Sequence, residues 1–242
     1  MDFLANYFGS LNPMSFLSAL PGNIAQGIIW GLMGLGVFLT FKLLNFADLS
    51  VDGSFATGGA VTAVMLINGC PVWATIIVAI LAGLAAGLVT GLLHTLLGIP
   101  DILAGILTQI ALYSINLNIM GKSNLPISYR NYTLVVSASN INMAILVGLG
   151  ICAVVIAAMY WYFGTEQGST IRSTGSNPAM SKAQGININF TKVIALALSN
   201  GLVALSGSLF AQYQGFADIN MGRGAIVIGL AAVIIGEVLG EA

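Results

Sequence analysis

The sequence predicts an all-α membrane protein, a polytopic transmembrane helical bundle of about six to eight membrane segments that include short or broken helices. Of its 242 residues, 57% are hydrophobic and only 6% are charged. Soluble domains carry about a quarter charged residues, because water must solvate their surfaces. Several apolar stretches also reach the length of about 20 residues that a helix needs to cross a bilayer. We therefore expect a single transmembrane domain over residues 1–242, in contact with lipid. The net charge of −1 excludes a basic surface for nucleic acid.

The spans follow from the gaps between charged residues. No Asp, Glu, Lys or Arg lies between Gly53 and Pro100, and the same holds from Asn131 to Thr165. Residues 76–82 are apolar on every face, which favours helices over barrel strands with a polar interior. The predicted spans cover residues 23–43, 54–68, 72–97, 102–120, 142–163, 191–213 and 224–239. The second and the last are short for a full crossing, so we expect them to be tilted, half-buried or incomplete.

Glycines at helical spacing indicate where helices pack closely. Gly83, Gly87 and Gly91 recur at every fourth position, and Gly27 and Gly31 repeat the pattern. Small residues at this spacing let backbones approach in lipid, where packing replaces the hydrophobic effect. We expect both sets to pack against neighbouring helices.

Polar side chains that interrupt the apolar pattern are the candidates for a solute path. Asn45, Asp48 and Asp52 lie around the junction of the first two spans. An ionised Asp costs about 2.5–3.5 kcal/mol at the bilayer centre, so it needs a cavity, a loop or a partner. Two interpretations stay open: a helix break that lines a polar path, or a turn in which Asp48 or Asp52 caps the next helix. Gln109 and Asn116 share one helix face, where they either line the path or bond to another helix.

No catalytic, metal or cofactor site is evident in the sequence. His94 is the single histidine, and Cys70 and Cys152 are far apart along the chain. No nucleophile–base pair, metal cluster or dinucleotide-binding loop accompanies them. We therefore expect a protein that is not an enzyme and that uses no cofactor and no metal.

A polar segment between the fifth and sixth spans, residues 164–190, is long for a plain connector. Within it, Asn177 and Pro178 predict the start of a short helix and Gly185 its end. Pro suits the first helical position, and Gly suits the position after the last turn. Arg172 and Lys182 of this segment, with Lys192 at the start of the next span, give three positive charges against two in the loop before the fifth span, which favours the cytoplasmic side.

This segment resembles a loop found in ABC importer permeases of the branched-chain amino acid type, which carry the motif R-x-T-G-x-N-P-x-A…A-x-G-I. The matching positions are Arg172, Thr174, Gly175, Asn177, Pro178, Ala183, Gly185 and Ile186. Residues 45–47 are similar to the family's N-F-A-H-G stretch, with Asp48 in place of His, and residues 229–236 are similar to a further family segment. The resemblance is strongest to a poorly characterised subgroup linked to aromatic amino acids or related small solutes.

The resemblance implies a membrane-spanning permease subunit of an ATP-driven importer in the plasma membrane of a bacterium. It would form the translocation path for a small solute such as an amino acid. Its partners would be a second permease copy, two cytoplasmic ATP-binding subunits that hydrolyse ATP, and an extracytoplasmic solute-binding protein. Residues 164–190 would be the cytoplasmic coupling loop. Family members usually continue further, so we expect the chain ending at Ala242 to be a natural short form, a fragment or a frameshift product.

The residues leave one alternative function open, an ion-gradient-driven secondary transporter or channel with Asp48 or Asp52 on the ion path. Inverted repeats would support it, but the two halves of the chain show no convincing similarity. The candidate path residues are the same for both functions: Asn45, Asp48, Asp52, Gln109 and Asn116.

Overall fold

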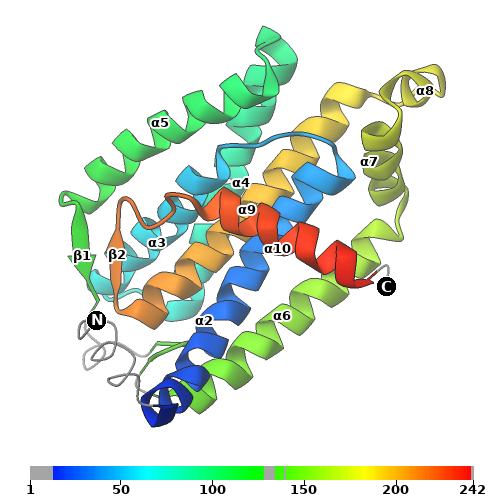
Figure 1. The fold of residues 1–242 in the computed structure, drawn as a ribbon. Coiled ribbons are helices and arrows are strands. Elements are labelled where there is room, and N and C mark those ends of the chain that lie inside the picture. Colours follow the sequence, from blue (N-terminus) through cyan, green and yellow to red (C-terminus); the bar gives the residue numbers. More distant parts are fainter. Residues whose placement is uncertain (1–12, 128–133, 139, 241–242) are drawn as a thin grey trace, which may run out of the picture.

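The computed structural model describes residues 13–127, 134–138 and 140–240, and it is built almost entirely of helices (Figure 1). In this described part, five helices are long and apolar enough to cross a membrane. They are Ala19–Leu43, Val72–Leu97, Asp101–Met120, Ile141–Phe163 and Ile188–Gln214. Two shorter apolar helices, Val51–Ile67 and Ala225–Gly240, accompany them. The predicted all-α polytopic bundle with short helices is therefore confirmed.

The elements follow the predicted spans closely. The helices, in chain order, are α2 (Pro13–Phe38), the π-helical turn η1 (Leu39–Leu43), α3 (Val51–Ile67), α4 (Val72–Leu97), α5 (Asp101–Met120), α6 (Ile141–Phe163), α7 (Glu166–Ser176), α8 (Pro178–Ala183), α9 (Ile188–Gln214) and α10 (Ala225–Gly240). The predicted ends agree to within a few residues, except that α2 begins well before its predicted start. Helix α7 was not predicted, because its residues have no apolar pattern.

A two-stranded ribbon joins the ends of α5 and α9. Strand β1 (Asn124–Pro126) pairs antiparallel with β2 (Phe216–Asp218). Both helices end at a glycine in the left-handed region, Gly121 with φ 65° and Gly215 with φ 76°. A residue without Cβ adopts this conformation at little cost, so each helix stops there and the chain turns into the strand.

Helix α9 forms the centre of the bundle, in contact with α2, α3 and α4. Most of its residues are buried, whereas α6 lies at the periphery and exposes apolar side chains that suit contact with lipid (Figure 1). Large exposed side chains of α6 include Tyr160 and Trp161. Aromatic residues of this kind are typical of the membrane–water interface, here at the end of α6 that leads into α7.

Close packing of α4 on α9 depends on glycine, as predicted for one of the two glycine sets. A Cβ atom at Gly83 or Gly87 would overlap the backbone of α9, and at Gly87 the overlap would be with Leu196. The prediction for Gly27 and Gly31 is wrong within this chain, since a Cβ added there meets no described atom within 4 Å. Both glycines are exposed, and Gly31 lines a pocket between α2 and α10.

Candidate functional site

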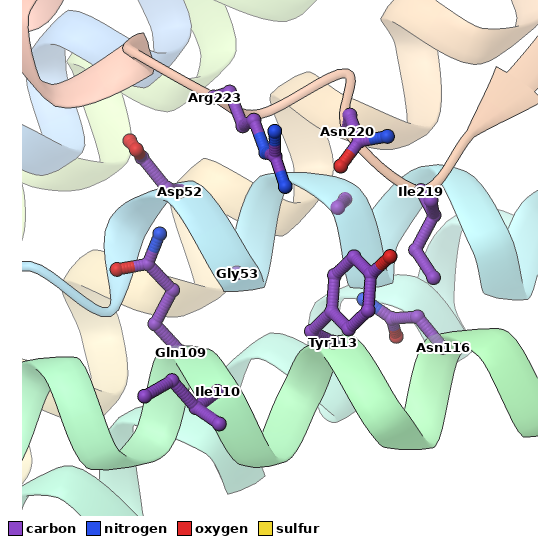
Figure 2. Close-up of a pocket in the computed structure, with 10 residues that line it drawn as sticks. Asp52, Gly53, Gln109, Ile110, Tyr113, Asn116, Ile219, Asn220 and Arg223 are labelled. Carbon is purple, nitrogen blue, oxygen red and sulfur yellow. The ribbon is translucent and has the colours of Figure 1, made fainter.

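A pocket of about 280 Å³ lies where α3, α5 and the segment between β2 and α10 meet (Figure 2). This volume is near the lower end of small-molecule pockets, about 300 Å³. We call it the polar pocket; it is lined by Asp52, Gly53, Ala56, Gln109, Ile110, Tyr113, Asn116, Ile219, Asn220 and Arg223. It holds three of the five predicted path residues, Asp52, Gln109 and Asn116. Gln109 and Asn116 meet there because they share a face of α5, as their spacing predicts.

Asp52 holds the amino end of α10. Its Oδ1 atom accepts a hydrogen bond from the backbone N–H of Ile226 at 2.9 Å, and its Oδ2 atom accepts one from Gly224 at 3.1 Å. The first N–H groups of a helix lack partners within the helix, and a carboxylate is favoured at this positive end. Asp52 lies in the first turn of α3, so the expectation that it caps the helix following the first span is wrong: it caps α10.

Asp48 lies outside the polar pocket and is buried, with 2% of its surface exposed. Its Oδ2 atom accepts a hydrogen bond from Asn200 Nδ2 of α9 at 2.7 Å, and its Oδ1 atom accepts one from the backbone N–H of Ser50 at 2.8 Å. Asn200 Oδ1 in turn accepts hydrogen bonds from the hydroxyls of Ser50 and Ser54. This network fixes the turn before α3 against the central helix, but Asp48 does not cap α3, because its backbone donor Ser50 lies before the first helical residue.

Asn45 is separate from the polar pocket as well. Its φ of 53° is left-handed, a conformation that Asn adopts more readily than most residues, and its side chain is exposed. Asn45 therefore lies in the turn that follows η1. The structure thus splits the five predicted residues into a pocket group and a loop group formed by Asn45 and Asp48.

Asn116 is the least satisfied residue of the polar pocket. Its side chain is 1% exposed, and neither amide atom has a hydrogen-bond partner among the described residues. Figure 2 shows it beside Tyr113, with Gln109 further along the same helix. Sequence reasoning missed Tyr113, Asn220 and Arg223. The position of Tyr113, between Gln109 and Asn116 on one helix face, was the available signal.

The predicted short helix of the 164–190 segment is confirmed as α8. Asn177 Oδ1 accepts a hydrogen bond from the N–H of Met180 at 3.0 Å, and Pro178 is the first helical residue. Ala183 ends the helix and Gly185 follows with φ 82°, as the predicted stop requires. The 164–190 segment leaves the bundle beside the carboxyl end of α6 (Figure 1).

Two further motif residues, Gly175 and Arg172, contact the bundle, and Thr174 and Ile186 complete the motif. Gly175 lies so close to η1 that a Cβ atom there would overlap the backbone oxygen of Leu43. Arg172 Nη2 donates to the backbone oxygen of Phe163 at 2.9 Å, at the end of α6. Thr174 is buried, with its hydroxyl unpaired in the described part of the chain. Ile186, after α8, donates its backbone N–H to Ser181 at 3.1 Å.

A family model described as the permease component of a branched-chain amino acid transport system matches residues 22–240. The chain belongs to this permease family. The match covers the polar pocket, the 164–190 segment and all five membrane-crossing helices apart from the first residues of one.

Three relatives show the range of solutes named for similar permeases. A tyrosine transport system permease protein of Clostridioides difficile (strain R20291) is 45% identical over 92% of this chain and 74% of the relative. A D-allose transport system permease protein of Escherichia coli (strain K12) is 28% identical over 95% and 71%. An autoinducer 2 import system permease protein of Enterobacter sp. (strain 638) is 28% identical over 95% and 66%. No solved structure matches the chain significantly.

The permease is therefore a membrane-spanning subunit of an ABC importer, a multi-pass protein of a bacterial plasma membrane. This decides between the two functions that the residues left open, in favour of the importer and against the ion-gradient-driven transporter. The role of the chain is transport, in agreement with the expectation of a non-enzymatic subunit.

Proposed function

We propose that the permease forms, together with a second copy, the translocation path of an importer for a small solute of the amino acid class. Aromatic amino acids are the first candidates, because the C. difficile relative, 45% identical, is named for tyrosine. The observation that carries the proposal is the polar pocket, which brings Asp52, Gln109 and Asn116 together between otherwise apolar helices. Polar groups at membrane depth usually mark a solute path.

The partners in this proposal are two ATP-binding subunits in the cytoplasm and a solute-binding protein outside. Residues 164–190 would be the cytoplasmic coupling loop, with α8 as the helix that seats on the ATPase. The contact between Gly175 and Leu43 supports this role, because movement of α7 would reach η1 directly. From η1 the chain passes through the Asp48 turn into α3, which carries Asp52.

In this mechanism the pocket group and the loop group have different tasks. Asp52, Gln109 and Asn116 would contact the passing solute. Asn45 and Asp48 would lie along the path's cytoplasmic approach and hold the start of α3. ATP-driven closure of the two ATPases would then move the spans between outward-open and inward-open packings as rigid bodies.

The test is ATP-driven uptake by the reconstituted importer. The permease is purified with its ATPase and placed in proteoliposomes with the binding protein, and uptake of labelled tyrosine, tryptophan and phenylalanine is measured. We expect accumulation that requires ATP and the binding protein. The control is the permease alone in vesicles with a proton or sodium gradient. Uptake under that condition, without ATPase, would contradict the proposal.

A further inference from the structure

Helices α3 and α10 both begin at the polar pocket. Helix α3 has 17 residues and α10 has 16, and Asp52 in the first turn of α3 bonds the first turn of α10. A Cβ atom at Gly222 would overlap the backbone oxygen of Asp52, so the two helix starts are in direct contact. The amino end of a helix carries a partial positive charge, and interrupted helices in transporters direct such ends at anionic groups of the solute.

The two charged side chains of the pocket differ in their hydrogen-bond partners. Each oxygen of Asp52 already accepts a backbone N–H at the start of α10, so both of its acceptors are engaged within the protein. The guanidinium of Arg223 extends into the pocket (Figure 2) and bonds to no described residue. Of the two charged side chains that line the pocket, only Arg223 has its charged group free of described partners and available to a bound molecule.

A second, independent feature points to a ligand. The Asn116 amide lines the pocket, is almost wholly buried, and has both its donor and its acceptor unpaired among the described residues. Buried amides nearly always have hydrogen-bond partners, because an unpaired one loses its bonds to water without replacement. A polar group of a bound molecule would supply the hydrogen-bond partner that the described residues do not provide.

We propose that the polar pocket binds the transported solute through a carboxylate held by Arg223, with Asn116 bonding a second polar group of the same molecule. A guanidinium matches a carboxylate in charge and in its planar, two-pronged geometry. An uncharged sugar offers no such match, so the pocket selects a carboxylate-bearing solute from the range named for related permeases. This inference rests on the proposed function and names the group that its site recognises.

Uptake of L-tyrosine by the complete importer in proteoliposomes tests the role of Arg223. Arg223→Gln removes the charge and lowers uptake about tenfold or more, the loss expected for one hydrogen bond to a charged group. Arg223→Lys keeps the charge without the planar fork and gives an intermediate rate. The control is Lys122→Gln, which removes an exposed charge outside the pocket lining and leaves uptake unchanged.

Asn116 is tested against a matched position on the same helix. Asn116→Ala raises the KM for tyrosine several-fold, whereas Asn118→Ala does not, because Asn118 is exposed and outside the pocket lining. Wild-type uptake by both Arg223→Gln and Asn116→Ala would overturn this inference and leave the proposed function standing.

A labelling experiment works without the ATPase. Asn220 is exposed and lines the pocket, so Asn220→Cys, in a full-length chain with Cys70→Ser and Cys152→Ser, is labelled in membranes with a small maleimide. Tyrosine and its desamino analogue, which keeps the carboxylate, slow the labelling, but tyramine, which lacks it, does not. Equal protection by all three compounds, or by none, would overturn the inference. Selective protection without ATP-driven uptake would support the pocket and refute the proposed function alone.

Discussion

Asp52 Oδ1 lies 2.9 Å from the backbone nitrogen of Ile226, so that a residue of the second apolar helix caps the last one. The two residues are far apart along the chain, and the bond joins the starts of two short helices at the wall of the polar pocket. A displacement of α3 would therefore carry the amino end of α10 with it. The bond therefore couples the wall of the pocket to the position of the last helix.

Removing this cap should lower the thermal stability of the permease. Asp52→Ala leaves the N–H groups of Gly224 and Ile226 without their acceptor, which costs about 0.5–2 kcal/mol for the loss of a helix cap. We expect a lower melting temperature of the detergent-solubilised protein and reduced uptake. Asp101→Ala is the control, because Asp101 lies in the first turn of α5 and makes no cap bond there. Equal melting temperatures for the two variants would contradict the capping role.

Gly175→Ala should separate ATP hydrolysis from transport. The added methyl group overlaps the backbone oxygen of Leu43 and forces α7 away from η1, at an overpacking cost of about 1–3 kcal/mol. The expected result is an intact complex whose ATPase rate no longer responds to solute-loaded binding protein. Gly150→Ala on α6 is the matched control, since a Cβ there meets nothing within 4 Å in the described structure. Normal solute stimulation in Gly175→Ala would show that this contact does not transmit movement.

Two substitutions of Asn177 should differ in their effect on the stability of α8. Asn177→Ala removes the acceptor for the N–H of Met180 and destabilises the start of α8 by about 1 kcal/mol, whereas Asn177→Asp retains an acceptor there. We expect faster amide hydrogen exchange in α8 for the Ala variant and near-wild-type exchange for the Asp variant. If both variants exchange alike, the side chain does not cap α8.

Asn200→Ala should be among the most destabilising single substitutions in the bundle core. It leaves the buried Asp48 carboxylate without its donor from α9, and an unpaired buried group costs about 1–3 kcal/mol, or more when charged. Ser54→Ala is the comparison, because it removes a hydroxyl from the network but leaves Asp48 bonded to Asn200. Thermal unfolding in detergent checks the order, and a Ser54→Ala loss as large as that of Asn200→Ala would contradict it.

The spans were predictable because each segment that crosses lipid must be apolar over about 20 residues. A run such as 72–97 has no charged residue, and its length alone marks the helix that the structure shows. The 164–190 segment was only partly predictable. Asn177, Pro178 and Gly185 signal α8 locally, but the polar α7 lacks an apolar pattern and depends on contacts with α6, α9 and η1.

The candidate site was predictable only where one helix supplies the residues. Gln109 and Asn116 share a face of α5, so their spacing brings them to one pocket. Asp52 and Arg223 meet at that pocket because α3 and α10 begin side by side, a juxtaposition that no local pattern records. Asp48 and Asp52 were equivalent candidates in the sequence because no local pattern shows which distant residue each one contacts. In the structure Asp48 bonds to Asn200 of α9.

The π-helical turn η1 places adjacent residues against two different elements. Lys42 forms an ion pair with Glu237 near the end of α10, while the backbone oxygen of Leu43 faces Gly175 of α7. A π turn holds more residues than an α turn, and such turns are frequent at functional sites. The turn at the carboxyl end of α2 therefore connects two elements that do not follow one another in the chain, the polar helix α7 and the last helix α10.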